Sequence, residues 1–118
     1  MVALLIALAY LYNVSCNAQP NTPQKDDLYT IMFYNAENLF DIYDDTLTND
    51  NEFLPDSRKK WDFYKYKTKL QHIYKTIMAS GSWEPPVIIG LCEIENRTVL
   101  NGLVNNTPLK KFEYSIIH

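Results

Sequence analysis

The stretch YTIMFYNAENLF, residues 29–40, decides the fold because it changes from apolar to polar within one short segment. On a strand, Ile31 and Phe33 face one side while Met32 and Tyr34 face the other. Both sides are therefore apolar, which is typical of a strand buried on both faces. Three polar residues follow where such a strand would leave the core, namely Asn35, Glu37 and Asn38. Open α/β sheets bind ligands at the carboxyl ends of their strands, so this end is a candidate site.

A second stretch downstream has the same form. The run VIIGLC, residues 87–92, is apolar throughout and is followed at once by Glu93. It is too apolar for a strand with one face in water, so it too is predicted to be buried on both faces. The chain therefore contains two predicted buried strands, roughly residues 28–34 and 87–92, and each closes on polar side chains.

The segment between the strands predicts a helix over residues 62–79. Its apolar residues recur at helical spacing and form one stripe, comprising Tyr66, Leu70, Ile73, Tyr74 and Ile77. Asp62 is suited to cap the start of this helix, and Gly81 is suited to its end. Four lysines lie mostly off the stripe, namely Lys65, Lys67, Lys69 and Lys75, and His72 lies beside it. A solvated helix face is the ordinary interpretation, and contact of the lysines with nucleic acid is the alternative.

The remainder of the chain predicts a second helix over residues 94–105 and a third strand over residues 112–118. The order is then strand-helix-strand-helix-strand, which indicates an α/β fold with neighbouring parallel strands. A sheet bounded by the third strand would have an exposed apolar edge. We therefore expect the 118 residues to be the N-terminal part of a longer protein.

The first 18 residues have the pattern of a secretory signal peptide. Residues 2–12 are an unbroken apolar run that is too short to span a bilayer comfortably, and no charged side chain precedes Lys25. Small residues at positions 16 and 18 suit cleavage before Gln19. A buried N-terminal helix of the fold is the alternative interpretation of this segment.

Two processing routes are open for such a leader. Cleavage after residue 18 leaves a polar linker over residues 19–27, no stable membrane insertion, and Cys92 as the one remaining cysteine. Lipidation of Cys16 is the other route, although Asn13 stands where an aliphatic residue is expected. Both routes predict an exported protein, periplasmic or secreted in the first case and lipid-anchored in the second.

The charge of the chain narrows the classes of function. A formal net charge of −3 argues against a wholly basic nucleic-acid binder, but it allows an enzyme that meets phosphates through a metal ion. Much of the negative charge lies in a long loop, residues 41–60, whose acids are Asp41, Asp44, Asp45, Asp50, Glu52 and Asp56. A calcium loop needs closer acid spacing and a glycine, and this loop has neither. It is predicted to be solvated and, given its length, to overhang a substrate groove.

The two strand ends predict a single site, because the carboxyl ends of neighbouring parallel strands lie side by side. Asn35 and Glu93 would then converge, and their oxygens are hard ligands that suit Mg²⁺, or Mn²⁺, rather than zinc. In this hypothesis Glu93 binds the metal, Asn35 holds a phosphate oxygen or a metal-bound water, and Glu37 reaches the metal or its water shell. Ordinary structural roles stay open: Asn35 could cap a turn, Glu37 could lie on the surface, and Glu93 could cap the next helix.

Two motifs carry a resemblance to a known family. The segments FYNAENLFD, residues 33–41, and IGLCEIEN, residues 89–96, resemble the first two motifs of the endonuclease/exonuclease/phosphatase family. That superfamily includes deoxyribonuclease-I-like nucleases, abasic-site endonucleases, sphingomyelinases and inositol-polyphosphate phosphatases. The similarity covers residues 28–118, and the pair of motifs with a helix between them is more specific than either motif alone.

The resemblance implies a fold, a chemistry and roles for three residues. The fold would be the N-terminal part of a four-layer α/β sandwich, with two facing mixed sheets and outer helices. Asn35 would be the active-site asparagine that contacts phosphate or metal, Glu93 the glutamate that binds the essential divalent metal, and Glu37 an acid near a second metal position. The implied activity is hydrolysis of a phosphoester by a nuclease or phosphodiesterase, most simply on nucleic acid, or by a lipid or small-molecule phosphatase.

Part of the family pattern has no counterpart in residues 1–118, namely the later Asp-Xaa-Asn and Asp-His pairs. In the family these pairs supply the histidine and the aspartate that orient or activate the attacking water. We therefore expect activity from the full-length protein and none from these 118 residues alone. A catalytically inactive, exported binding module on the same scaffold is the hypothesis from a different class.

Overall fold

The computed structural model describes residues 28–46 and 49–118. Its elements in chain order are strand β1 (Ile31–Leu39), the 3₁₀ turn η1 (Asn51–Phe53), helix α2 (Phe63–Ser80), strand β2 (Ile88–Ile94), helix α3 (Arg97–Asn105) and the 3₁₀ turn η2 (Pro108–Phe112). The predicted signal peptide and linker, residues 1–27, lie outside the described residues. None of the helices in the described part of the chain combines the length and hydropathy that crossing a bilayer requires.

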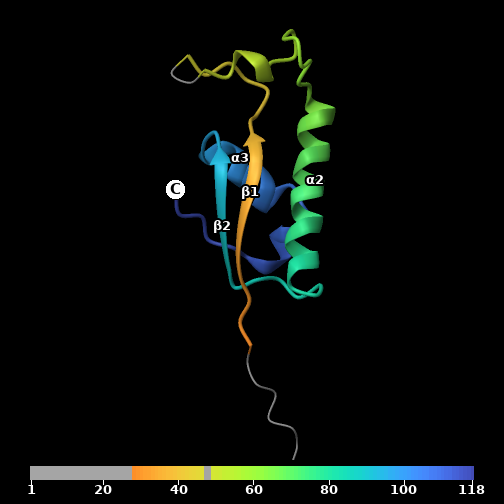
Figure 1. Cartoon of the computed structure of the whole chain (residues 1–118), viewed down its shortest axis with the longest axis vertical. Helices are drawn as coiled ribbons and strands as arrows, with labels where there is room; N and C mark the ends of the chain where they lie inside the picture. The colour runs from red at the N-terminus through yellow and green to blue at the C-terminus, as the bar shows by residue number, and fades with distance from the viewer. Residues whose placement is uncertain (1–27, 47–48) are drawn as a thin grey trace, which may run out of the picture.

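The two strands form a parallel pair, as predicted (Figure 1). The register is regular from Ile31 opposite Ile88 to Asn35 opposite Cys92, and it resumes at Leu39 opposite Ile94 after an irregularity. Both strands run past their predicted ends, because β1 and β2 extend through the polar residues that follow the apolar runs. The carboxyl ends of β1 and β2 therefore lie at one edge, where the sequence predicts the site.

Helix α2 forms where the apolar stripe and its cap predict it. The carboxylate of Asp62 accepts a hydrogen bond from the backbone N–H of Lys65 at 2.9 Å, which satisfies one unpaired donor of the first turn. Gly81 is the C-cap residue. In Figure 1 the helix runs beside β1 and covers one face of the two-stranded sheet. His72 is exposed on it, as expected.

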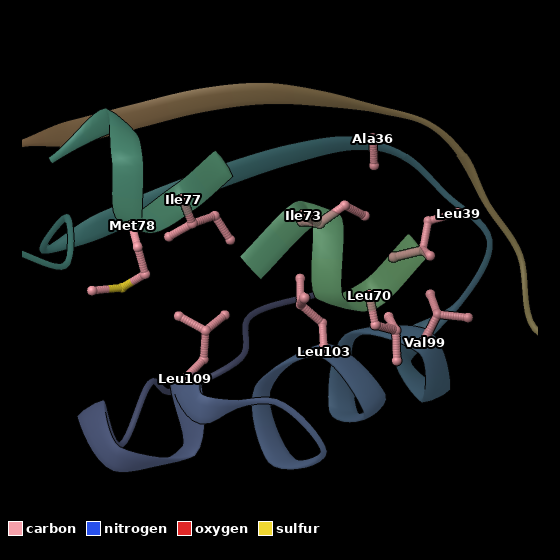
Figure 2. Packing of buried hydrophobic residues seen from close by; sticks show 9 residues of the cluster. All are labelled: Ala36, Leu39, Leu70, Ile73, Ile77, Met78, Val99, Leu103 and Leu109. Atoms are coloured by element: carbon pink, nitrogen blue, oxygen red, sulfur yellow. The ribbon is translucent and has the colours of Figure 1, made fainter. Parts of the chain in front are cut away.

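The core lies between this sheet face and the two helices (Figure 2). Its buried side chains come from four elements: Ala36 and Leu39 from β1, Leu70, Ile73, Ile77 and Met78 from α2, Val99 and Leu103 from α3, and Leu109 from η2. Figure 2 shows the leucines of α3 and η2 directed toward the isoleucines of α2. Burial of such a side chain contributes roughly 1.5–3 kcal/mol, so this cluster fixes α2 against the strand ends.

The opposite face of the sheet corrects the prediction that both strands are buried on both sides. Ile31, Phe33 and Ile88 are 68%, 79% and 57% exposed. They alternate with Met32 and Tyr34, which pack against the core. The described helices all contribute to the core on the Met32 face, so no described element covers the other one. We call Ile31, Phe33 and Ile88 the outer face.

Three further predictions are corrected in the second half of the chain and in the loop. The strand predicted over residues 112–118 does not form, since Phe112 ends η2 and residues 113–118 are irregular. Tyr114 and Ile116 each make one hydrogen bond instead: the Tyr114 hydroxyl donates to the Pro86 carbonyl, and Arg97 Nη2 donates to the Ile116 carbonyl at 3.1 Å. Helix α3 begins at Arg97, after residue 94, because the Asn96 side chain caps it. The acidic loop is not wholly solvated, since Asp41 and Asp50 are 8% and 1% exposed.

Candidate functional site

Asn35 and Glu93 meet at the carboxyl edge of the sheet. The Nδ2 of Asn35 donates a hydrogen bond to the Oε1 of Glu93 at 2.8 Å, and both side chains are exposed. The pairing of Asn35 with Cys92 in the parallel ladder places Asn35 next to Glu93. The structure thus brings together the two residues that the strand ends predict, while their roles in catalysis stay predictions.

The Asn35 side chain is held from two directions. Its Oδ1 accepts a hydrogen bond from the backbone N–H of Glu37 at 2.7 Å, which is the turn-capping role that was the ordinary alternative. Because Oδ1 is occupied by this donor, Nδ2 is the group presented to Glu93. The turn role and the site role are therefore compatible in one side chain.

The backbone is strained at both strand ends. Glu37, Asn38 and Glu93 have φ values of 53°, 64° and 57°, in the left-handed region that non-glycine residues rarely adopt. Such residues cost of order 1–3 kcal/mol each, and they cluster at functional sites where surrounding contacts hold them. Two of the three carry the carboxylates predicted to lie near the metal, and the bulge in the β1 ladder falls at the same place.

The side chains at this edge can be tested against the metal that the motifs imply. In the described residues no three His, Cys, Asp or Glu side chains are grouped as a multidentate protein site would require. Mg²⁺ does not need such a group, because it binds one or two carboxylates and keeps water or substrate oxygens as its other ligands. Glu93 with Glu37 fits that donor set, and both are exposed.

A second network joins the strand ends and was missed from the sequence. The Oε2 of Glu95 accepts a hydrogen bond from the backbone N–H of Asp41 at 2.8 Å, and the Nδ2 of Asn96 donates to the Oδ2 of Asp41 at 3.3 Å. The backbone N–H of Glu95 donates to the Leu39 carbonyl at 3.1 Å. We call Asp41, Glu95 and Asn96 the acidic bracket. Asn96 lies inside the helix predicted over residues 94–105, so neither its capping role nor its contact with Asp41 was predicted.

The acidic bracket concentrates negative charge in a partly buried place. Burial raises the pKa of the Glu95 carboxyl, and the carboxylates of Asp41, Asp50 and Asp45 raise it further, although the hydrogen bond from Asp41 lowers it. Asp50 accepts from the Asp45 backbone N–H at 2.9 Å through Oδ2, while its buried Oδ1 has no hydrogen-bond partner in the described residues. The network thus brings several carboxylates close together in a partly buried position.

A shallow groove adjoins Glu37 on the α2 side. Its lining combines aromatic and basic side chains, including Tyr34, Trp61, Tyr64, Lys65, Lys69 and His72. Helix α2 carries four lysines and no acid between Phe63 and Ser80. An acidic protein therefore presents one basic, aromatic surface next to the strand ends.

Comparison with known families decides the identity of the fold. The model of the endonuclease/exonuclease/phosphatase family matches residues 30–118, a span that contains both motifs and every described helix and strand. The chain belongs to this family. Comparisons with curated proteins and with solved structures gave no match.

Members of the endonuclease/exonuclease/phosphatase family are hydrolases that typically use divalent metals. The two-stranded parallel sheet and the two α-helices agree with the α/β class expected for the family. The four-layer arrangement stays a prediction, because the described residues contain one sheet.

Proposed function

We propose that the full-length protein is an exported, Mg²⁺-dependent phosphodiesterase, most specifically a nuclease. The observation that carries this proposal is the Asn35–Glu93 pair, which lies within the two family motifs at the carboxyl edge of a parallel strand pair. The export part rests on the pattern of residues 1–18.

The residues present suit a metal-assisted hydrolysis. Glu93 would bind the ion, Glu37 would bind it or its water shell, and Mn²⁺ is compatible with the same oxygens. The bound ion supplies Lewis-acid polarisation of the phosphate and offsets developing negative charge. Asn35 Nδ2 is an oriented donor that can bind a phosphate oxygen next to Glu93.

The groove beside Glu37 favours nucleic acid over a small phosphate. Bases stack on aromatic side chains such as Tyr64 and Trp61, and lysines such as Lys65 attract the phosphate backbone. Tyr64 is 76% exposed, so its ring is available for such a contact. A small phosphate needs no extended surface of this kind.

The test compares substrates and variants of the full-length protein. We expect Mg²⁺-dependent cleavage of plasmid DNA and of bis(4-nitrophenyl) phosphate, both lost on chelation. Glu93→Gln should lower the rate on both substrates by roughly a hundredfold or more, whereas the control Glu84→Gln, an exposed glutamate on the turn after α2, should not. Absence of both activities, or a Glu93→Gln enzyme as fast as the control, would overturn the proposal.

A separate comparison tests the substrate class. Tyr64→Ala should raise KM for DNA and leave bis(4-nitrophenyl) phosphate hydrolysis unchanged, because the small ester does not reach the groove. Activity on the small ester without activity on DNA or RNA would point to a phosphatase acting on lipid or small phosphates.

A further inference from the structure

We propose that Lys69 is a positioning residue for the Asn35–Glu93 pair, acting from helix α2 through the turn that contains Glu37 and Asn38. This inference rests on the proposed function for its kinetic part and on geometry alone for its structural part. Neither family motif contains Lys69, and the spacing of α2 predicts only a solvated lysine there.

The ammonium group of Lys69 closes the strained turn. Its Nζ donates to the Glu37 carbonyl at 2.6 Å and to the Asn38 carbonyl at 3.3 Å. These are the two consecutive residues of β1 with positive φ, and they lie where the β1–β2 register is interrupted, so Lys69 supplies a donor that the ladder does not. A charged donor makes stronger bonds than a neutral one, which offsets part of the cost of the left-handed backbone.

Hydrogen bonds of the turn connect Lys69 to the Asn35–Glu93 pair. The Glu37 residue that binds Lys69 through its carbonyl also donates its own N–H to the Oδ1 of Asn35 at 2.7 Å. The other end of the same amide, Nδ2, binds Glu93 Oε1 at 2.8 Å. The Lys69 ammonium, the Glu37 backbone, the Asn35 amide and the Glu93 carboxylate thus form a continuous series from α2 to β2, and the orientation of the Asn35 amide depends on the Glu37 backbone.

The placement of Lys69 differs from that of its neighbours on the helix. Lys67 is exposed and makes no hydrogen bond or ion pair among the described residues, while Lys65 donates to the Lys59 carbonyl at 2.7 Å. Lys69 is half-buried, and its charge lies within electrostatic reach of the Glu37 and Glu93 carboxylates. Core packing of Leu70 and Ile73 fixes the helix turn from which Lys69 extends.

The kinetic test uses Lys69→Met, which keeps an unbranched side chain and removes the donors, with Lys67→Met as the matched control. In the full-length protein we expect Lys69→Met to lower kcat for bis(4-nitrophenyl) phosphate by roughly ten- to a hundredfold at saturating Mg²⁺, and Lys67→Met to change it less than about twofold. Lys69→Arg should recover part of the rate, because it restores charged donors with a different geometry. Equal rates for both methionine variants would overturn the inference.

A double-mutant cycle separates positioning from general damage to the fold. If Lys69 acts through Asn35, Lys69→Met should reduce kcat by less than about twofold in an Asn35→Ala background. Full additivity of the two losses, measured below the melting temperature of every variant, would contradict action through Asn35.

A spectroscopic measurement tests the geometry without activity. The side-chain amide signals of Asn35, assigned by their loss in Asn35→Ala, should shift in Lys69→Met and stay in place in Lys67→Met. Unmoved signals in Lys69→Met would refute the inference even in an active enzyme. Shifted signals in a protein without hydrolytic activity would support the positioning while the proposed function failed.

Discussion

Asn35 and Glu93, which lie 58 residues apart in the sequence, share a hydrogen bond of 2.8 Å between Nδ2 and Oε1. The bond joins the two family motifs across the parallel strand pair. The donor end of the Asn35 amide therefore faces the Glu93 carboxylate. Changing that end to an acceptor removes the bond and places two acceptors against each other.

Replacing the amide with a carboxylate should make the stability of the fold depend on pH. In Asn35→Asp two carboxylates face each other, which raises the folded-state pKa of the pair above its unfolded value of about 4. The raised pKa means that the variant is relatively stable below pH 4 and loses stability as pH rises through the folded value. Urea unfolding of the full-length protein should show a loss of about 1 kcal/mol near pH 7.5 that shrinks toward pH 4.

The control for this change is Asn101→Asp, which adds the same charge on an exposed position of α3. If both aspartate variants follow the wild-type pH dependence, the contact between residues 35 and 93 does not persist in solution.

The acidic bracket gives a second pH prediction, in which the substitution is expected to stabilise the fold rather than destabilise it. Burial and the charges of Asp41, Asp50 and Asp45 raise the pKa of Glu95 from its usual 4.5, so its contribution to stability is present at low pH and lost as pH rises above that value. Glu95→Gln keeps an oxygen to accept from Asp41 and removes the charge. It should stabilise the protein at pH 7.5 by up to about 1 kcal/mol after screening by solvent.

The stabilisation by Glu95→Gln should shrink when the urea titrations are repeated near pH 4, because the wild-type carboxyl is then mostly protonated in both states. Glu113→Gln, at an exposed position outside the acidic bracket, serves as the control. A Glu95→Gln variant that is less stable than wild type at pH 7.5 would show that the hydrogen bond outweighs the repulsion.

Helix α3 packs against α2 through Gly102. This contact predicts that the effect of Gly102→Ala on stability changes sign when Tyr66 is replaced by phenylalanine. A Cβ at position 102 would overlap the hydroxyl oxygen of Tyr66, while the Leu70 Cδ1 would lie at an ordinary 3.5 Å. Gly102→Ala should therefore destabilise the protein by roughly 1–3 kcal/mol through overpacking. In a Tyr66→Phe background the overlapping oxygen is absent, and the same change should stabilise by about 0.5–1 kcal/mol through helix propensity.

Thermal melts of the four proteins in this cycle give the measurement. A Gly102→Ala cost that is unchanged by Tyr66→Phe would place the obstruction elsewhere, for example at the Leu70 side chain.

The outer face predicts self-association of the 118-residue chain. Phe33 is 79% exposed and lies over Gly90, next to Ile31 and Ile88. Contiguous apolar surface of this kind drives association of soluble proteins. Sedimentation velocity should show oligomers or aggregates that decrease in Phe33→Lys, whereas Tyr64→Lys, which replaces an equally exposed ring on α2, should leave them unchanged. A monomeric wild-type chain would refute this prediction.

Local signals predict the first helix closely and the parallel pairing of the two strands, although β1 begins and ends several residues later than predicted. Residues 62–79 agree with α2 to one residue at each end, because the apolar stripe and the Asp62 cap act within the helix itself. Parallel pairing follows from the strand-helix-strand order, and with it the meeting of Asn35 and Glu93. The predictions that failed concern structure that depends on contacts between distant parts of the chain. Residues 112–118 have a strand-like composition, yet a strand exists only where a partner supplies ladder bonds.

The supporting contacts of the site were beyond reach of sequence patterns for the same reason. Lys69 is one of four lysines on α2, and only the packing of that helix against β1 distinguishes it from Lys67. The burial of Asp50 likewise depends on how the acidic loop folds back, since acidic residues in a loop predict solvation. Candidate site residues can be predicted from their type and their position in the sequence, whereas the residues that hold their side chains in place cannot.

The left-handed backbone at Glu93 has a consequence for engineering. A glycine at that position would adopt a φ of 57° without the steric cost that a glutamate meets there, on the order of 1 kcal/mol. Glu93→Gly thus relieves a steric cost that offsets the extra conformational entropy a glycine loses on folding, and it removes the carboxylate on which the proposed chemistry depends. A directed-evolution campaign scored on thermostability alone would not select against the loss of this carboxylate, so libraries should hold residue 93 fixed or select for the proposed activity at every round.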